Sequence, residues 1–284
     1  MVSTEHHGSK TINYQMYHIL IQLCCISCIA VAAEERLPQS LPAVPLLRGH
    51  AHNDYLHPRP LFDALDNGFC SVEADIFLVN DSLLVAHFFF SLRAERTLES
   101  LYLEPLRKRA QEFDGKILPD AERFYLWIDF KTEARSTYAA LRTMLEQYAD
   151  ILTRYEDGVK IPGAVTVILT GTAGLDLIQE ERVRYAVVDG RLGALDSDVS
   201  VDLIPVVSLN WRQEFPRFTG TLTPDQQEKL ADQVRRAHER GRKLRYWNAP
   251  DNEEFWQILY DAGVDLINTD RLKALRDFLK ERSE

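Results

Sequence analysis

Three acidic residues in two separate stretches of the chain have the types and spacing of a metal site. Glu73 and Asp75 lie two residues apart in the apolar run 70–78, so as strand residues both side chains point to one face. Asp129 lies in a second apolar run, 124–131. Carboxylates held together repel one another unless a cation lies between them, and oxygen-only donors suit a hard ion. We therefore predict that Glu73, Asp75 and Asp129 bind one divalent cation, Mg²⁺ or Ca²⁺; the alternative is three unrelated acids at solvated strand ends.

Histidines near these acids indicate proton transfer. His50 and His87 each end a short apolar run. Two histidines that face each other across a substrate can act as general base and general acid, and we predict these roles for His50 and His87. His52 and His57 follow in a loop, and their roles stay open. His238 lies within a helical pattern and is predicted to be structural.

Two more residues near strand ends suit a substrate pocket. Lys131 lies two residues after Asp129 and shares its face, so its charge can meet a phosphate group. A salt bridge to the same carboxylates is the alternative for Lys131. Trp247 ends another apolar run and is predicted either to line the pocket or to pack in the core.

Eight short apolar runs predict the strands that position these residues. They are 46–50, 70–78, 124–131, 164–170, 185–188, 203–209, 244–248 and 264–268. Another run, 83–87, follows the turn Asn80-Asp81-Ser82 and predicts the return arm of a hairpin.

Amphipathic stretches separate most of the predicted strands. They cover 61–67, 97–113, 137–155 and 271–282, and Thr223-Pro224-Asp225-Gln226 has the pattern of a capped helix start. Strand–helix alternation predicts a parallel sheet covered by helices. Eight strands in a chain of this length predict a single-domain TIM (β/α)8 barrel, with the active site at the carboxyl ends of the strands. A doubly wound open sheet is the alternative fold.

The composition excludes several classes of protein. The 284 residues are 45% hydrophobic and 27% charged, which is typical of a globular protein and excludes disordered and fibrous chains. Lys and Arg number 33 against 43 Asp and Glu, and the net charge of −10 argues against a nucleic-acid partner. Cys24, Cys25 and Cys28 share one apolar run near the N-terminus, so the body holds no disulfide scaffold or cysteine zinc cluster. Cys70 is predicted to be a buried core thiol.

The N-terminal segment has the pattern of an export signal. Residues 17–33 are uncharged and apolar, Lys10 precedes them, and Ala30, Ala32 and Ala33 close the run. We predict a signal peptide over 1–33, a linker over 34–45 and the barrel over 46–284. The protein would then be periplasmic or extracellular. An uncleaved segment would instead anchor it to a membrane.

Taken together, the motifs resemble those of the phospholipase-C-like phosphodiesterase superfamily, which includes glycerophosphodiester phosphodiesterases and sphingomyelinase D enzymes. The matching set is Gly49-His50, Glu73-x-Asp75, His87 and Asp129-x-Lys131. The string Gly-His-Ala-His-Asn-Asp-Tyr that begins at Gly49 most resembles the subgroup of altered inheritance of mitochondria protein six and its bacterial homologues.

The resemblance implies roles for residues of this chain. It implies that Glu73, Asp75 and Asp129 hold the metal and that His50 and His87 exchange protons. It places Lys131 and Trp247 near the phosphate, and Asn53 matches the sphingomyelinase D pattern. Attack on phosphorus then comes from water or from a neighbouring substrate hydroxyl.

The sequence also departs from the glycerophosphodiester branch. That branch has H-R-G at the first strand, a following E-N-T and an H-D after the hairpin, whereas this chain has His50-Ala51, no E-N-T, and His87 followed by Phe88–Phe90. Asp129 stands where those enzymes have Glu. The Phe88–Phe90 run suggests either an apolar lip for a lipid tail, with contact to a membrane surface, or ordinary packing between helix and barrel.

The prediction for function is a metal-dependent phosphodiesterase that hydrolyses or cyclises a glycerophosphodiester or phospholipid headgroup by acid–base catalysis with His50 and His87. His50-Ala51-His52 also resembles the H-x-H metal motif of amidohydrolase barrels, but such sites need histidines from later strands, and after His87 the chain has only His238. A non-catalytic ligand-binding barrel is the third alternative. We expect a small-molecule or lipid phosphodiester as the partner, and a monomer.

Overall fold

Eight parallel strands form the body of the protein. The computed structural model describes Met1 and residues 43–282. In chain order the strands are β1 (Gly49–Ala51), β2 (Ser71–Val79), β4 (Tyr125–Phe130), β7 (Thr166–Gly171), β9 (Ala186–Gly190), β10 (Val206–Asn210), β11 (Lys243–Trp247) and β12 (Ile267–Thr269). Each pairs in parallel with the next of these strands up to β11, and β12 pairs with β1. A bridge between Arg245 and Leu266 nearly closes the ring, so the TIM-barrel prediction is confirmed and the open-sheet alternative is wrong.

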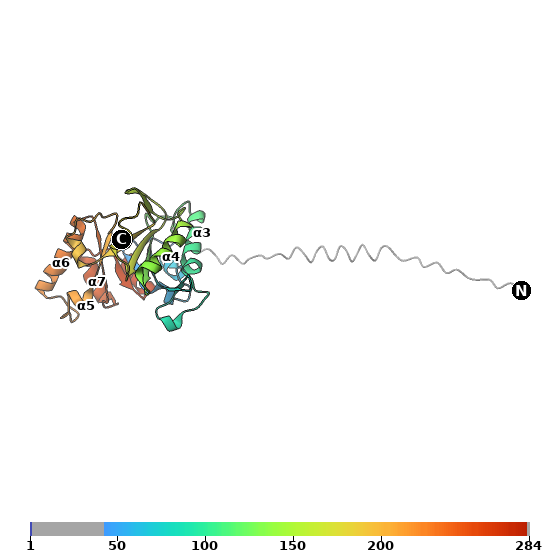
Figure 1. The fold of residues 1–284 in the computed structure, drawn as a ribbon. Helices are drawn as coiled ribbons and strands as arrows, with labels where there is room; N and C mark the ends of the chain where they lie inside the picture. Colours follow the sequence, from blue (N-terminus) through green and yellow to red (C-terminus); the bar gives the residue numbers. More distant parts are fainter. Residues whose placement is uncertain (2–42, 283–284) are drawn as a thin grey trace. The chain divides into compact units, whose positions relative to one another are not determined.

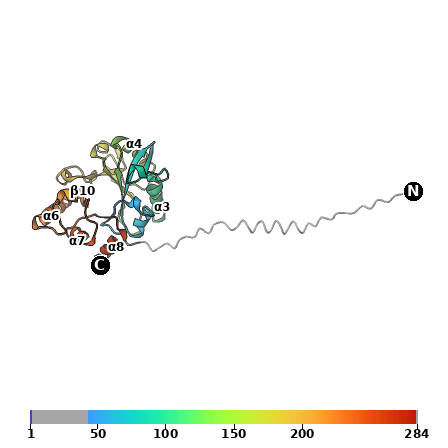
Figure 2. The same cartoon turned by 90° about the horizontal axis from the view of Figure 1, so that it is seen from below.

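Helices surround this ring, as Figures 1 and 2 show. They are α2 (Phe62–Asp66), α3 (Glu104–Glu112), α4 (Ala134–Glu146), the short α5 (Trp211–Glu214), α6 (Pro224–Glu239), α7 (Glu253–Asp261) and α8 (Leu272–Lys280). A π-helical turn, Glu99–Leu103, leads into α3. The capped start of α6 is confirmed: Gln226 N–H donates to Thr223 Oγ1, and Thr223 N–H donates to Gln226 Oε1. α7 lies outside the amphipathic stretches predicted from the sequence.

The connections between β4 and β10 differ from the predicted alternation. The helix predicted over 137–155 ends at Glu146, and Arg154–Glu156 is instead strand β5. Asp157 and Gly158 both have positive φ and turn the chain back into β6 (Val159–Ile161), because an Asp-Gly pair suits a tight hairpin turn. With β8 (Val183–Arg184) these strands form a small separate sheet. Short 3₁₀ turns, Leu175–Leu177 and Leu192–Leu195, lie in two connections for which the sequence predicted no amphipathic stretch.

The predicted hairpin after the second strand is confirmed. β3 (Ser82–Val85) pairs antiparallel with the end of β2. Asn80 and Asp81 form the turn with positive φ values of 46° and 62°, a conformation that Asn and Asp tolerate better than most residues. This hairpin returns the chain to the level of Asp75, where Ala86 N–H donates to Asp75 O. His87, the next residue, therefore lies close to Asp75.

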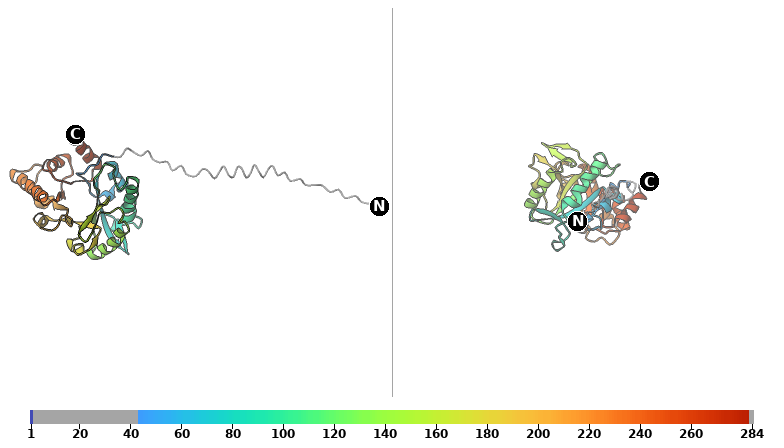
Figure 3. Two further views of the ribbon diagram at one scale, coloured as in Figure 1. Left: turned by 90° about the horizontal axis from the view of Figure 1, so that it is seen from above. Right: turned by 90° about the vertical axis from the view of Figure 1, so that its right-hand side faces the viewer.

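The core has two parts. A small cluster that includes Trp127, Ile168, Val187 and Val206 is separate from the larger cluster between the barrel and its helices. Cys70 is buried as predicted, and burial raises the pKa of its thiol to about 12. The described residues 43–282 form one compact unit with this core (Figure 3).

The predicted signal segment, 1–33, and most of the linker, 34–45, lie outside the described residues. Within the described part of the chain, every helix is too short or too polar to cross a bilayer.

Candidate active site

The three predicted acids meet near the point where the pairing of β2 with β4 ends, at the carboxyl end of β4. Asp75 and Asp129 lie directly opposite each other on these paired strands, and Glu73 lies one step deeper, opposite Trp127. Each of the three offers an oxygen within 4.8 Å of the other two. Glu73 and Asp75 are buried, and Asp129 is partly exposed.

Burial and mutual repulsion act on the protonation of these acids. Burial raises the pKa of Asp129 to about 6, Lys131 opposes this shift, and Asp75 and Glu73 add to it. Burial and the charge of Glu73 also raise the pKa of Asp75. At Glu73 burial acts in the same direction, but Arg245 and the hydrogen bond with His50 hold its pKa below the ordinary value. An added positive charge would therefore stabilise the ionised forms of Asp75 and Asp129.

Lys131 supplies part of that charge. Its Nζ lies 3.0 Å from both Asp75 Oδ2 and Asp129 Oδ1. The salt-bridge alternative from the sequence is therefore confirmed. A contact between Lys131 and phosphate stays a prediction.

The geometry of the acids fits one divalent cation. Ligands on opposite sides of an ion are about 4.2 Å apart for Mg²⁺ and about 4.8 Å for Ca²⁺, from their usual bond lengths. The separations, all within 4.8 Å, meet the limit for Ca²⁺, and carboxylates are donors that both ions prefer. Gly171 at the end of β7 keeps space beside Asp129, because a Cβ there would lie 2.4 Å from Asp129 Oδ1.

His50 lies beneath this cluster and does not line the pocket. Its side chain is 0% exposed. Trp127 Nε1–H donates to Ser71 Oγ (3.0 Å), and Ser71 Oγ lies 2.7 Å from His50 Nδ1. His50 Nε2 lies 3.3 Å from Glu73 Oε2. Burial and Arg245 lower the pKa of His50 to about 4, so the neutral ring accepts from Ser71 and donates to Glu73. With both nitrogens engaged, His50 is placed to orient Glu73 rather than to face His87 across a substrate.

His52, whose role the sequence left open, lies on the pocket wall instead. Its Nδ1 lies 2.9 Å from Asp270 Oδ1, which joins the end of β1 to the segment after β12. Its Nε2 lies 4.0 Å from Glu73 Oε2. Burial opposes protonation, but the Asp270 hydrogen bond and the charge of Glu73 raise the pKa of His52. Asn53 also lines the pocket and donates to Asp270 from Nδ2 at 3.3 Å.

His87 faces the same pocket from the hairpin. Its Nδ1 lies 3.3 Å from Asp75 Oδ2 and 2.9 Å from the hydroxyl of Tyr55. The Tyr55 hydroxyl donates to Asp75 Oδ2 at 2.6 Å. His52 and His87 therefore share one arrangement, in which Nδ1 meets a carboxylate and Nε2 is left toward the pocket. Tyr55 was in the motif string of the first strand, but its role was not recognised.

Two arginines and an aspartate on the opposite side of the pocket were missed from the sequence. Arg245 is 4% exposed, lies with its guanidinium 4.5 Å from the Trp127 ring centre, and approaches Glu73 to 3.9 Å. Its Nε and Nη1 have no hydrogen-bond partner among the described residues. Asp189 at the end of β9 binds Arg191 Nη1 at 2.7 Å. The available signals were that Asp189 directly follows the predicted strand 185–188 and that Arg245 lies two residues before Trp247 on the same face of a predicted strand.

These side chains line one pocket of about 480 Å³ at the carboxyl ends of the strands. Its lining includes His52, Asn53, Glu73, Asp75, His87, Asp129, Lys131, Asp189, Arg191, Arg245 and Trp247. Trp247 is 40% exposed and lies in this lining rather than in the core, and a contact between Trp247 and substrate stays a prediction. His57 lies outside this lining, and His238 on α6 pairs with Asp265.

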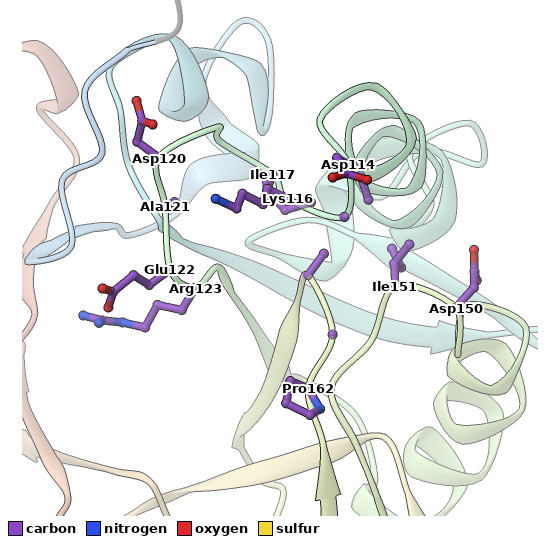
Figure 4. Close-up of a pocket in the computed structure, with 14 residues that line it drawn as sticks. Asp114, Lys116, Ile117, Asp120, Ala121, Glu122, Arg123, Asp150, Ile151 and Pro162 are labelled. Atoms are coloured by element: carbon purple, nitrogen blue, oxygen red, sulfur yellow. The ribbon is translucent and has the colours of Figure 1, made fainter.

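A second depression, also about 480 Å³, lies at the opposite end of the barrel (Figure 4). The segments 114–123 and 162–164 that line it precede β4 and β7. Figure 4 shows that Asp114, Lys116, Asp120 and Asp150 do not converge on a common point. The amino ends of barrel strands serve stability rather than catalysis, so the candidate active site is the pocket at the carboxyl ends.

The fold and this site define a class of protein: a TIM barrel with an acidic, histidine-flanked pocket at the carboxyl ends of its strands. Residues 41–189 match the model of the AIM6-like phosphodiesterase domain, and the chain belongs to this family.

Relatives in fungi match over most of the chain. The altered inheritance of mitochondria protein 6 homolog of Arthroderma benhamiae is 30% identical, over 81% of this chain and 82% of its own length. Altered inheritance of mitochondria protein 6 of Eremothecium gossypii is 32% identical, over 87% of this chain and 72% of its own length. A phosphodiesterase from Oleispira antarctica, solved with its product sn-glycerol-3-phosphate, shares the fold at a TM-score of 0.50 and 13% identity, covering 82% of this chain and 96% of that one.

Proposed function

We propose that this protein is a divalent-metal-dependent phosphodiesterase that hydrolyses or cyclises a glycerophosphodiester or a phospholipid headgroup. The observation that carries the proposal is the cluster of Glu73, Asp75 and Asp129, whose oxygens lie within 4.8 Å of one another in a pocket that also holds three cationic side chains. Mg²⁺ or Ca²⁺ held by these three residues would neutralise the charge that develops on the phosphoryl oxygens.

The charges of the pocket suit a phosphodiester. Four carboxylates line it, against the three cations Lys131, Arg191 and Arg245. One divalent ion changes this formal balance from one net negative charge to one net positive charge. A phosphodiester carries one negative charge and therefore complements the metal-loaded pocket.

We assign proton transfer to His52 and His87. Both line the pocket, and each has Nδ1 beside a carboxylate, which orients the ring and leaves Nε2 to exchange a proton. One imidazole takes the proton of the attacking water or substrate hydroxyl, and the other returns a proton to the leaving oxygen. This assignment replaces His50 of the sequence-based prediction by His52, because His50 is buried with both ring nitrogens bonded.

Arg245 and Lys131 are assigned to the phosphate. Arg245 lines the pocket, and its Nε and Nη1 have no hydrogen-bond partner among the described residues, which supports a role of this guanidinium in holding the anionic phosphate. Trp247 forms the adjacent wall and contributes an apolar surface for the rest of the substrate.

The amidohydrolase alternative gains nothing from the structure. Among the described residues, the group of candidate metal ligands within 4.8 Å of one another consists of carboxylates and includes neither His50 nor His52. Asp270 is bonded to His52. Measured turnover of a phosphodiester would distinguish an enzyme from a non-catalytic ligand-binding barrel.

The test is phosphorus NMR of residues 42–284 with glycerophosphodiesters, lysophospholipids and sphingomyelin, with Mg²⁺ or Ca²⁺ and then with EDTA. We expect a phosphomonoester or cyclic phosphate that appears with metal and stops with EDTA. Asp129→Asn should abolish turnover, whereas Asp120→Asn at the opposite end of the barrel should leave it unchanged. No product with either metal would overturn the proposal in favour of a binding role.

A further inference from the structure

Three consecutive phenylalanines stand out on the surface beside the active site. Phe88, Phe89 and Phe90 are 53%, 68% and 84% exposed. They are called the Phe loop below. Packing between helix and barrel, one of the two alternatives from the sequence, is wrong for these rings. Contiguous exposed apolar surface of this kind marks a site of interaction with a partner or a membrane.

The exposure of the Phe loop is built into its local structure. Ser91 Oγ accepts from Phe88 N–H at 3.3 Å and donates to Phe88 O at 2.7 Å, which closes the turn. The rings of Phe88 and Phe90 stack with centroids 5.1 Å apart, and Phe89 packs edge-on against Phe77 at 6.1 Å. These contacts hold the rings together at the surface. In Figure 1 this stretch, coloured between blue and green, protrudes from the edge of the barrel.

The Phe loop adjoins the mouth of the pocket. The ring of Phe88 lies 4.3 Å from that of His87, which lines the pocket. Four other large apolar side chains that are exposed also lie at the carboxyl ends of barrel strands or after them: Leu56 and Phe62 after β1, Leu192 after β9 and Trp247 at the end of β11. The exposed Val44 and Val201 instead precede β1 and β10, and Val159 lies on the small separate sheet. Apolar groups are therefore displayed at the end of the barrel where the candidate active site opens.

We propose that the Phe loop inserts into the interfacial region of a phospholipid membrane, with the mouth of the pocket facing the lipid headgroups. Aromatic rings favour the boundary between headgroups and acyl chains. The net charge of −10 opposes attraction to an anionic surface, so the membrane we infer is zwitterionic and the contact is apolar. Delivery of a headgroup to the pocket rests on the proposed function, whereas membrane binding does not.

Vesicle sedimentation tests the proposal without any need for turnover. Residues 42–284 are mixed with phosphatidylcholine vesicles at low and high salt, and the bound fraction is measured. We expect binding that depends little on salt. The double variant Phe89→Ser/Phe90→Ser should reduce partitioning by about tenfold or more, because two exposed rings no longer leave water.

Two controls separate the membrane contact from the fold and from catalysis. Val159→Ser removes another exposed apolar side chain, on the small separate sheet, and should leave vesicle binding unchanged. Turnover of a soluble glycerophosphodiester should be the same in Phe89→Ser/Phe90→Ser as in the unsubstituted protein, because Phe89 and Phe90 lie outside the pocket lining. Circular dichroism checks that both variants fold.

Three outcomes would overturn the proposal. The first is no binding to phosphatidylcholine vesicles, and the second is unchanged binding of Phe89→Ser/Phe90→Ser. The third is a dimer in lipid-free solution, seen by sedimentation velocity, that Phe89→Ser/Phe90→Ser converts to a monomer; the Phe loop would then cover a second copy of the chain. Vesicle binding in a protein that turns over no phosphodiester would leave this inference standing and sink the proposed function alone.

Discussion

His52 and Asp270 join the first and last strands of the barrel through a contact of 2.9 Å between His52 Nδ1 and Asp270 Oδ1. The same contact directs Nε2 of the imidazole toward the pocket and Glu73. A residue at one end of the folded chain is thus oriented by a residue more than two hundred positions later.

This pair predicts a graded loss of activity. His52→Ala should lower kcat by about 10²- to 10⁴-fold, the usual contribution of a positioned acid or base. Asp270→Asn should lower kcat less, because the imidazole remains but loses its carboxylate partner. Steady-state kinetics of the metal-loaded protein measure both effects. As a control, His238→Gln on α6 alters a histidine–aspartate pair outside the pocket and should keep kcat; full activity of His52→Ala would remove this histidine from the mechanism.

His50 is expected to act through Glu73 as a positioning residue. His50→Ala should weaken metal binding by about 10- to 100-fold, as is usual when the partner of a metal ligand is removed. Saturating metal should restore much of the turnover. His50→Gln keeps a donor for Glu73 and should retain more of the metal affinity. Titration calorimetry with Mg²⁺ or Ca²⁺ measures the affinities, and turnover lost beyond recovery by metal would instead mark His50 as a proton-transfer residue.

Gly171 offers a test of the space around Asp129. Its φ is +72°, and a Cβ would meet Asp129 Oδ1 at 2.4 Å, so Gly171→Ala requires both a strained backbone and a displaced carboxylate. We expect a destabilised protein with weaker metal binding, measured by thermal unfolding with and without the ion. Gly193→Ala is the matched control, because a Cβ there meets no atom within 4 Å. Equal metal affinity in the two variants would contradict the close approach of β7 to the acidic cluster.

Asp54 predicts a pH dependence of stability that is separate from the pocket. Its Oδ2 accepts from Leu61 N–H at 2.6 Å and from the Tyr102 hydroxyl at 2.8 Å. Burial outweighs these hydrogen bonds and raises the pKa of Asp54 from 3.8 to about 7. The folded state therefore binds this proton more tightly than the unfolded state. The contribution of Asp54 to stability is complete below the unfolded pKa and is lost as pH rises through the folded pKa.

Urea unfolding across this range measures the effect. The part of the unfolding free energy due to Asp54 should fall by about 1.4 kcal/mol per pH unit between the two pKa values. Asp54→Asn should flatten the curve there. Asp198→Asn, at an exposed side chain, should leave the curve as in the unsubstituted protein. A curve that is equally steep in Asp54→Asn would show that other groups cause the dependence.

Much of the fold could be predicted because local patterns repeat along the chain. Short apolar runs separated by amphipathic stretches predicted eight strands and a barrel, and the structure has both. The errors fall where local pattern and long-range pairing compete. The apolar residues of 148–155 continue a helical pattern, but pairing with Val159–Ile161 across Asp157-Gly158 makes part of the stretch a strand.

The acids of the site could be predicted for a similar reason. The two-residue period of a strand places Glu73 and Asp75 on one face, and β4 pairs beside β2, so Asp129 joins them. The sequence alone therefore determined the barrel, the acidic cluster and the end of the barrel at which the chemistry lies.

Only the tertiary structure decided how deep each side chain lies. His50 and His52 share a face of the first strand, yet one is buried beneath Glu73 and the other lines the pocket. Arg245 lies two residues before Trp247, so strand period places both side chains on one face. Only the tertiary structure shows that Arg245 also lines the pocket. Strand period determines which face a side chain takes, whereas its depth below the rim depends on the stagger between neighbouring strands. That stagger is set by packing across the whole barrel, and no local stretch of sequence contains it.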